Sequence, residues 1–303
     1  MSQSRFSGVL APVITPFRVD LAPDSLRFTN HCKWVVSHGA SLAVFGTNSE
    51  SNSLSVDEKS ELLQVIVDAG IDPNHLMPGT GCCAISDSIV LTKRAVELKC
   101  AGALMLPPFY YKGVSDQGLF DFFAKVIEEV ADDRLHIYLY HIPPISHIPI
   151  SLKLIERLAA RYPKNIAGIK DSSGDWTQTQ AFNDLGIENF AVFCGSESYL
   201  LRNMQAGGAG CISATANVNP SAINDLCSHW QDDNAELRQE KLNRVRNIFQ
   251  TYPMIAGLKA ATAIYSEDSE WLRVRPPLTQ LTEQQISKLS ADLSGADFEM
   301  PGI

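Results

Sequence analysis

The sequence predicts an α/β protein: a (β/α)8 barrel followed by a C-terminal helical extension. Eight short apolar runs recur along the first three quarters of the chain, and an amphipathic segment follows most of them. The runs are almost continuously apolar, which is typical of parallel strands that are covered on both faces. Repeated alternation of strand and helix is the pattern of a parallel barrel. We therefore expect a catalytic barrel over residues 1–225 and a helical region over residues 226–303.

The eight predicted strands are bounded by turn residues. They cover residues 9–17, 41–46, 76–81, 102–108, 135–143, 166–173, 190–197 and 210–217. An open, doubly wound sheet is the alternative arrangement, but it calls for a glycine-rich phosphate-binding turn after the first strand. No such turn follows the first run, so the pattern favours the closed barrel.

Helix start signals separate the predicted strands. Small polar residues that can cap a helix stand at or near the head of five segments, at Asp24, Ser55, Asp87, Ser115 and Ser151. Ser55 and Glu58 together form a capping box. The helices that we expect are residues 25–38 and 59–69 early in the chain, and residues 235–250, 254–265 and 282–293 after the last strand.

Composition and charge exclude several classes of function. Apolar residues make up 45% of the chain and charged residues 19%, which is ordinary for a globular protein. The net charge is −9 and no cluster of Lys or Arg appears, so nucleic acid and membrane surfaces are poor partners. Residues 1–6 show no apolar signal-peptide core, and the seven cysteines form no CxxC pair. We expect free thiols and a cytoplasmic location.

Polar residues at the carboxyl ends of the strands are the candidate site, because active sites of barrel enzymes gather there. Lys170 is the unusual one, since it follows an apolar stretch in a strand that should face the barrel interior. Lysine is rarely buried unless it is paired or used in chemistry. It could bond to the neighbouring Asp171 or extend to the barrel mouth. The functional interpretation is an amine nucleophile, whose neutral form burial favours.

An amine that attacks a keto acid also needs a proton shuttle and a group that holds the carboxylate. Tyr140 lies on the adjacent predicted strand, and Thr47 and Tyr110 are candidate hydroxyl partners for it. Tyr138 and Tyr140 could instead both be core aromatics. The turn over residues 46–51 presents successive backbone N–H groups, which can bind a carboxylate without a charged side chain.

A divalent metal site is the competing hypothesis. His141, His147 and Glu50 carry the right donor atoms, and a metal would make the protein a metal-dependent barrel enzyme. Their spacing matches no common metal-binding motif. We therefore expect no metal and no cofactor.

The motifs together resemble the dihydrodipicolinate synthase / N-acetylneuraminate lyase family of class I (Schiff-base) pyruvate aldolases. They occur in the family's order along nearly the whole chain: 46-GTNSES-51, 79-GTG-81, 108-PFY-110, 140-YHIP-143, 168-GIKDSSG-174 and the strand at residues 210–217. The resemblance implies an α/β barrel lyase that needs no cofactor and is commonly a homotetramer.

The resemblance also implies a role for each matching residue. Lys170 forms an imine with pyruvate, and Tyr140 is the general acid and base. Thr47 relays the proton, and Tyr110 completes the relay from a neighbouring subunit. The remaining implied contacts are the backbone N–H groups of Thr47 and Asn48 on the pyruvate carboxylate and Ile212 in the pocket wall.

Departures from the family motifs bear on the second substrate. Ile145 stands where dihydrodipicolinate synthases carry an arginine that binds the aldehyde's carboxylate, and such a contact contributes about 1.5–3 kcal/mol. His141 replaces an asparagine, Asn48 a hydroxylated residue and Ser49 a glycine. We expect Ile145 and His141 to contact the second substrate, and the isoleucine suggests a less acidic aldehyde.

These observations predict reversible aldol cleavage or condensation between pyruvate and an aldehyde. Three alternatives stay open at this point. The first is a true 4-hydroxy-tetrahydrodipicolinate synthase of lysine biosynthesis. The second is a keto-deoxy sugar-acid dehydratase or hydratase-aldolase that uses the same lysine imine. The third belongs to other classes: a metal-dependent barrel enzyme or a non-catalytic pyruvate-binding protein.

Overall fold

The computed structural model describes residues 6–303; residues 1–5, on which the expectation about a signal peptide partly depends, lie outside it. Seven parallel strands form one sheet in the order β2-β1-β7-β6-β5-β4-β3. The strands are β1 (Gly8–Ala11), β2 (Ser41–Leu42), β3 (Ala103–Met105), β4 (Ile137–His141), β5 (Ile166–Asp171), β6 (Ala191–Cys194) and β7 (Gly210–Ile212). Each lies within or directly beside a predicted strand, and most are shorter than predicted.

The segment over residues 76–81 is the one predicted strand that does not form a regular ladder. It makes two isolated parallel bridges, from Leu76 to Leu42 of β2 and from Gly79 to Leu104 of β3. Pro78 has no N–H for a ladder hydrogen bond. A Cβ atom on Gly79 would lie 2.1 Å from a backbone oxygen, so the chains approach too closely for any other residue. The prediction of a strand here was wrong, but the bridges join the two edge strands and close the sheet into a barrel.

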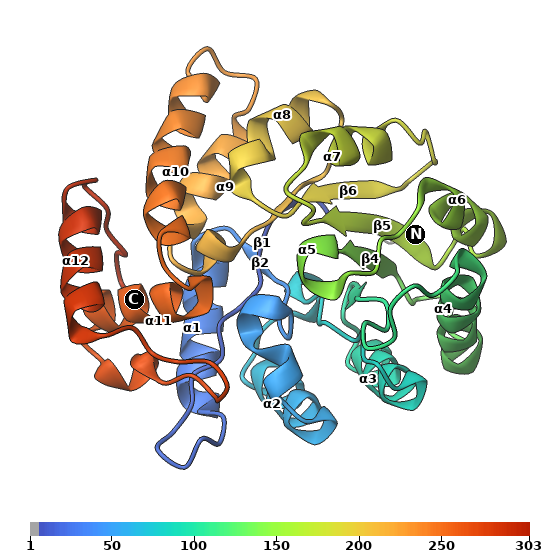
Figure 1. Cartoon of the computed structure of the whole chain (residues 1–303), viewed down its shortest axis with the longest axis horizontal. Helices are drawn as coiled ribbons and strands as arrows, with labels where there is room; N and C mark the ends of the chain where they lie inside the picture. The colour runs from blue at the N-terminus through green and yellow to red at the C-terminus, as the bar shows by residue number, and fades with distance from the viewer. Residues whose placement is uncertain (1–5) are drawn as a thin grey trace.

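Helices surround the strands (Figure 1). They are α1 (Ser25–Ser37), α2 (Val56–Asp68), α3 (Ile85–Glu97), α4 (Asp116–Val130), α5 (Pro143–Ser146), α6 (Leu152–Arg161), α7 (Trp176–Asn183), α8 (Leu200–Gln205), α9 (Pro220–Ser228), α10 (Ala235–Gln250), α11 (Met254–Ser266) and α12 (Glu283–Ser294). Among the helices of residues 6–303, none has the length and apolar character of a membrane span.

The predicted helix caps are largely confirmed. The side chains of Asp24, Ser55, Ser115 and Ser151 each accept a hydrogen bond from a backbone N–H in the first turn of their helix. Ser55 and Glu58 form the predicted capping box. Asp87 lies in the first turn of α3 instead of capping it, and its carboxylate is favourable there because of the helix dipole.

The last three helices pack against the barrel and against one another. α10 contacts α8 and α9, and α11 contacts α10 and α12 (Figure 1). α9 spans residues 220–228, so the division that we predict between residues 225 and 226 falls inside a helix and stays a prediction. α10 also contacts the turn over residues 197–199 that follows β6, and α11 contacts the turn over residues 214–217 that follows β7.

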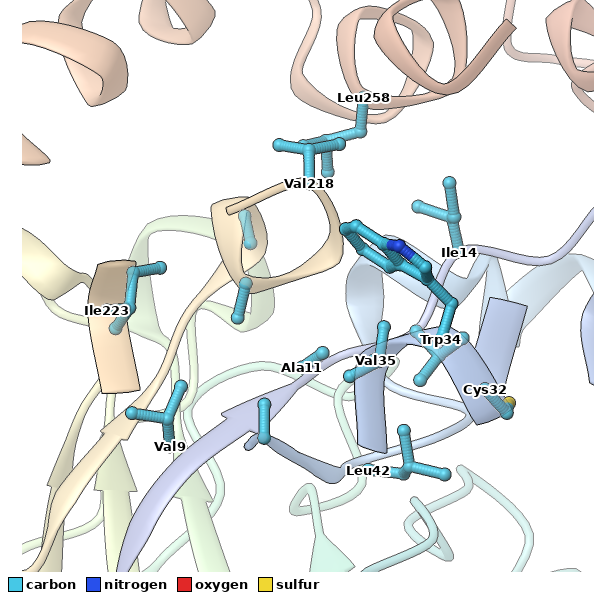
Figure 2. Close-up of a cluster of buried hydrophobic side chains, with 14 of the residues drawn as sticks. Val9, Ala11, Ile14, Cys32, Trp34, Val35, Leu42, Val218, Ile223 and Leu258 are labelled. Carbon is cyan, nitrogen blue, oxygen red and sulfur yellow. The ribbon is translucent and has the colours of Figure 1, made fainter. Parts of the chain in front are cut away.

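An apolar cluster joins the first strand to the C-terminal helices. Figure 2 shows Val9 and Ala11 of β1, Ile14 after that strand and Trp34 of α1 in this cluster, with Val218 and Leu258 above them. Leu258 on α11 is fully buried, so the cluster spans both predicted regions of the chain. Burial of such side chains stabilises by roughly 1.5–3 kcal/mol each. The C-terminal helices are therefore held to the barrel by a shared core.

His31 is a buried histidine of α1 within this core. It is 2% exposed, and its ring packs 5.8 Å from that of Trp34. Its Nε2 lies 3.4 Å from the Asn217 side-chain oxygen, while its Nδ1 has no hydrogen-bond partner among residues 6–303. Burial lowers the pKa of His31 from 6.5 to about 4 because the charged ring would lose its hydration.

This pKa predicts a specific loss of stability in acid. Only the unfolded chain binds a proton at His31 between pH 6.5 and about pH 4, so the stabilisation is complete above pH 6.5 and is lost as the pH falls. We expect a loss of about 3 kcal/mol from this group across that window. Urea unfolding at several pH values would measure it. His31→Gln should flatten the profile by the same amount, and parallel profiles for the two proteins would contradict the prediction.

Candidate active site

A cavity of about 380 Å³ opens at the carboxyl ends of β4, β5 and β7. Six of the residues predicted for the site line it: Thr47, Asn48, Tyr140, Ile145, Lys170 and Ile212. The parallel register pairs Tyr140 of β4 with Lys170 of β5, which places the two side chains next to each other. The fold thus brings together residues that are up to 165 positions apart in the sequence, as with Thr47 and Ile212.

Lys170 is buried at the base of this cavity without an acidic partner. It is 3% exposed, and its Nζ lies 4.2 Å from the centroid of the Tyr140 ring. No hydrogen bond or ion pair joins Lys170 to a carboxylate within residues 6–303. The Asp171 carboxylate instead accepts hydrogen bonds from the Ser173 N–H and hydroxyl, both at 2.9 Å, and from the Thr179 hydroxyl at 2.6 Å. The alternative that Asp171 holds Lys170 as a structural pair is wrong.

Tyr140 carries a hydroxyl that another hydroxyl holds in place. Its Oη lies 3.2 Å from Thr47 Oγ1, and the tyrosine is 4% exposed. Tyr138 points to the same face of β4, one layer deeper in the barrel, where its hydroxyl accepts the Phe6 N–H at 2.9 Å and its ring packs on Phe193. Tyr138 is thus a core aromatic, whereas Tyr140 faces the cavity.

The turn over residues 46–51 is locked by its own side chains. The Ser49 hydroxyl accepts the Gly46 N–H at 3.2 Å, and Thr15 donates to the Ser49 carbonyl at 2.8 Å. The backbone N–H groups of Thr47 and Asn48 donate to no acceptor in the described part of the chain. Thr47 and Asn48 both line the cavity, so their N–H groups are candidates to bind an anion there.

Tyr110 and His141 are two predicted site residues that the structure does not bring to the cavity. Tyr110 is 73% exposed, and its ring lies 5.3 Å from the Tyr111 ring, measured between centroids. A role in this site therefore requires a second copy of the chain. His141 is buried on the opposite side of β4 from Tyr140, as strand alternation dictates. Its Nδ1 accepts the Ile150 N–H at 3.0 Å, and burial lowers its pKa.

The ligands of the competing metal hypothesis are not assembled. The Glu50 carboxylate pairs with Lys259 and accepts the Arg275 N–H at 2.9 Å. His147 lies in an exposed turn. Within residues 6–303, no three His, Cys, Asp or Glu side chains are grouped as a metal site. Glu50 is thus committed to an ion pair, which was not apparent from its place in the sequence.

Three cavity residues come from the C-terminal helices, a region in which the sequence predicts no site residue. Arg246 and Gln250 lie on α10, and Met254 begins α11. Arg246 belongs to a helix with many charged residues, and its side chain is only 12% exposed. Charges in an amphipathic helix normally face solvent, so the sequence carries no signal that this one turns inward.

The fold and the site define a class of protein. A buried lysine at the carboxyl end of a barrel strand, beside a hydrogen-bonded tyrosine, is the arrangement of a class I aldolase, and the protein is a lyase of this class. The model of the Dihydrodipicolinate synthetase family matches residues 5–296. The chain belongs to that family, whose barrel is a TIM barrel.

Known proteins of similar sequence and structure agree with this assignment. The chain is 35% identical over 225 residues to the 4-hydroxy-tetrahydrodipicolinate synthase of Thermus thermophilus, covering 73% of each chain. It is 29% identical over 287 residues to an uncharacterized DapA-like lyase of Chloroflexus aurantiacus, covering 94% of this chain and 95% of the other. The dihydrodipicolinate synthase structure from Agrobacterium tumefaciens superposes with a TM-score of 0.88 at 27% identity, covering 95% and 99% of the two chains.

Proposed function

We propose that the protein catalyses reversible aldol cleavage or condensation between pyruvate and an aldehyde through an imine on Lys170. The observation that carries the proposal is the buried Lys170 Nζ, which has no acidic partner in the described chain and lies 4.2 Å from the ring of Tyr140 in an open cavity. No carboxylate holds the Lys170 nitrogen in a pair, so the amine is placed to attack a keto carbon in the cavity.

The chemistry follows from the placement of these groups. The Lys170 amine adds to the keto carbon, and loss of water gives the imine. The imine draws electrons from the adjacent methyl group, which loses a proton to give an enamine that attacks the aldehyde carbon. Tyr140 supplies and removes protons at these steps, and its hydrogen bond to Thr47 orients the hydroxyl.

Backbone donors and an apolar wall are suited to orient pyruvate. The N–H groups of Thr47 and Asn48 are proposed to bind the carboxylate, and Ile212 lies in the cavity wall. An anion site of this kind binds the carboxylate without a charged side chain.

We propose a homotetramer or dimer in which Tyr110 of a second copy extends the Thr47–Tyr140 relay. Its 73% exposure and its aromatic neighbour Tyr111 support a contact between subunits. The proposed location is the cytoplasm.

Ile145 bears on the identity of the aldehyde. Ile145 lines the cavity at the position where dihydrodipicolinate synthases carry an arginine. That difference argues against lysine biosynthesis, although relatives at 28–31% identity over nearly the whole chain bear the name 4-hydroxy-tetrahydrodipicolinate synthase. An aldehyde panel with a pyruvate-consumption assay tests this, and a clear preference for aspartate semialdehyde would favour lysine biosynthesis.

Reductive trapping tests the central proposal. The protein is incubated with pyruvate and borohydride, and its intact mass is measured. We expect one reduced pyruvate adduct per chain, located on Lys170 by peptide mapping. Absence of an adduct on folded protein, or an adduct on another lysine, would overturn the proposal.

The relay predicts a large effect of Tyr140→Phe. Loss of the hydroxyl removes the general acid and base, so kcat should fall by about 10²–10⁴-fold. Tyr138→Phe is the matched control, because its hydroxyl lies one layer deeper on the same strand. Steady-state kinetics of both variants would check this. Equal losses in the two variants would mean that the effect comes from packing.

A further inference from the structure

Arg246 enters the cavity from the C-terminal helix α10 with unused hydrogen-bonding capacity. Its Nη1 lies 3.4 Å from a Glu197 carboxylate oxygen and 3.4 Å from the Ser213 hydroxyl, which are long contacts for a guanidinium. Its Nε is buried and has no acceptor within residues 6–303. Arginine offers five donors in a planar fork that suits a carboxylate.

Glu197 does not saturate this guanidinium. Glu197 is 1% exposed, and its two carboxylate oxygens accept hydrogen bonds from the hydroxyls of Ser213 and Thr215. The Gln239 amide donates to its backbone carbonyl at 2.9 Å, which fixes the segment to α10. Glu197 thus offsets the charge of Arg246 and holds it in position, while donors of the fork stay available.

The cavity has one further basic residue besides Arg246. Of the described residues that line it, only Lys170 and Arg246 are basic. The Lys170 nitrogen is committed to the imine, and the pyruvate carboxylate is assigned to backbone N–H groups of the turn over residues 46–51. Arg246 therefore remains as the basic group for the other substrate.

We propose that Arg246 binds a carboxylate at the far end of the aldehyde substrate. This inference rests on the proposed function and specifies its second substrate: a carboxylated aldehyde in condensation, and a dicarboxylic 2-keto acid in cleavage. Ile145 alone suggests a less acidic aldehyde, because it replaces the arginine that dihydrodipicolinate synthases carry at this position. Arg246 on α10 supplies a guanidinium from a different element of the fold. The terminal carboxylate is thus held from the side of α10.

Matched aldehydes test the proposal. Initial rates of pyruvate consumption are compared for succinate semialdehyde and for butanal, which has the same chain length without the carboxylate. The wild-type enzyme should prefer succinate semialdehyde. Arg246→Gln should lower kcat/KM for this substrate by about 10–100-fold, mainly through KM, and change it for butanal by less than about threefold. Arg246→Lys should retain part of the preference, because it keeps the charge without the fork.

Two controls separate this inference from the proposed function. Arg244→Gln, on the exposed face of the same helix, should leave both substrates unchanged. Arg246→Gln should still form the borohydride-trapped pyruvate adduct. The role of Arg246 in carboxylate binding would be overturned if Arg246→Gln lowered kcat/KM equally for both aldehydes, or if this variant alone lost the pyruvate adduct. A stronger preference of the wild-type enzyme for glyceraldehyde 3-phosphate than for succinate semialdehyde would also overturn it. Absence of the adduct in the wild-type enzyme would overturn the proposed function, and this inference with it.

Discussion

Replacing Lys170 with alanine is expected to abolish the borohydride-trapped pyruvate adduct and to lower kcat by at least about 10³-fold. The imine requires a primary amine at this position, and no other cavity residue of the described chain can supply one. Lys170→Arg should be equally inactive, because it keeps the positive charge but cannot form the imine. Lys153→Ala, an exposed lysine of α6, is the matched control and should keep full activity. Intact mass and steady-state kinetics measure both effects.

Stability distinguishes a catalytic Lys170 from a structural one. A structural lysine stabilises the fold through its partners, so its removal costs free energy. Lys170 is 3% exposed, and the stabilising contact of its side-chain nitrogen among residues 6–303 is with the Tyr140 ring, an interaction of about 0.5–2 kcal/mol. We therefore expect Lys170→Met to be as stable as the wild-type protein or more stable by thermal unfolding. A destabilisation above about 2 kcal/mol would contradict the catalytic assignment.

Much of the barrel could be predicted because its signals are local. Capping residues such as Ser55 and Ser151 accept hydrogen bonds from the backbone of their own helix, so the residues next to them in the sequence are enough to predict the cap. Lys170 could be singled out because a charged residue in an apolar strand conflicts with its surroundings. The prediction of a strand over residues 76–81 was wrong because the segment forms two isolated bridges and no regular ladder. The close approach of a neighbouring backbone to Gly79 depends on the tertiary structure, and the local sequence does not reveal it.

The contribution of the C-terminal helices could not be predicted because it depends on long-range packing. Arg246 and Gln250 reach the cavity through the packing of α10 on α8 and α9, which no local pattern encodes. His141 was assigned to the substrate from its motif, yet the two-residue period of the strand turns it away from Tyr140. Successive side chains of a strand point to opposite faces, so the position of His141 next to Tyr140 in the sequence already predicts that it lies on the outer face of β4.

The ion pair between Glu50 and Lys259 links α11 to the turn that we propose binds the substrate carboxylate. Both side chains are fully buried, and Lys259 also donates to the Arg273 carbonyl at 2.6 Å. Burial lowers the pKa of Lys259 to about 8 although Glu50 acts to raise it. The desolvation of the ammonium therefore exceeds the attraction of its partner, and we infer that the pair fixes geometry more than it stabilises the fold. Glu50 directly follows the Thr47–Ser49 turn and has a left-handed backbone with φ of 55°.

Lys259→Met is expected to destabilise the protein by about 3–5 kcal/mol, because it leaves the Glu50 carboxylate buried without its cation. The double variant with Glu50→Gln should recover much of this loss, since the neutral amide can still accept the Arg275 N–H. Urea unfolding of the single and double variants measures the coupling. The double variant should nevertheless keep a raised KM for pyruvate, because the turn that carries Thr47 and Asn48 has lost its anchor. If stability and KM recover together, the pair acts on stability alone, and α11 has no part in ordering the substrate site.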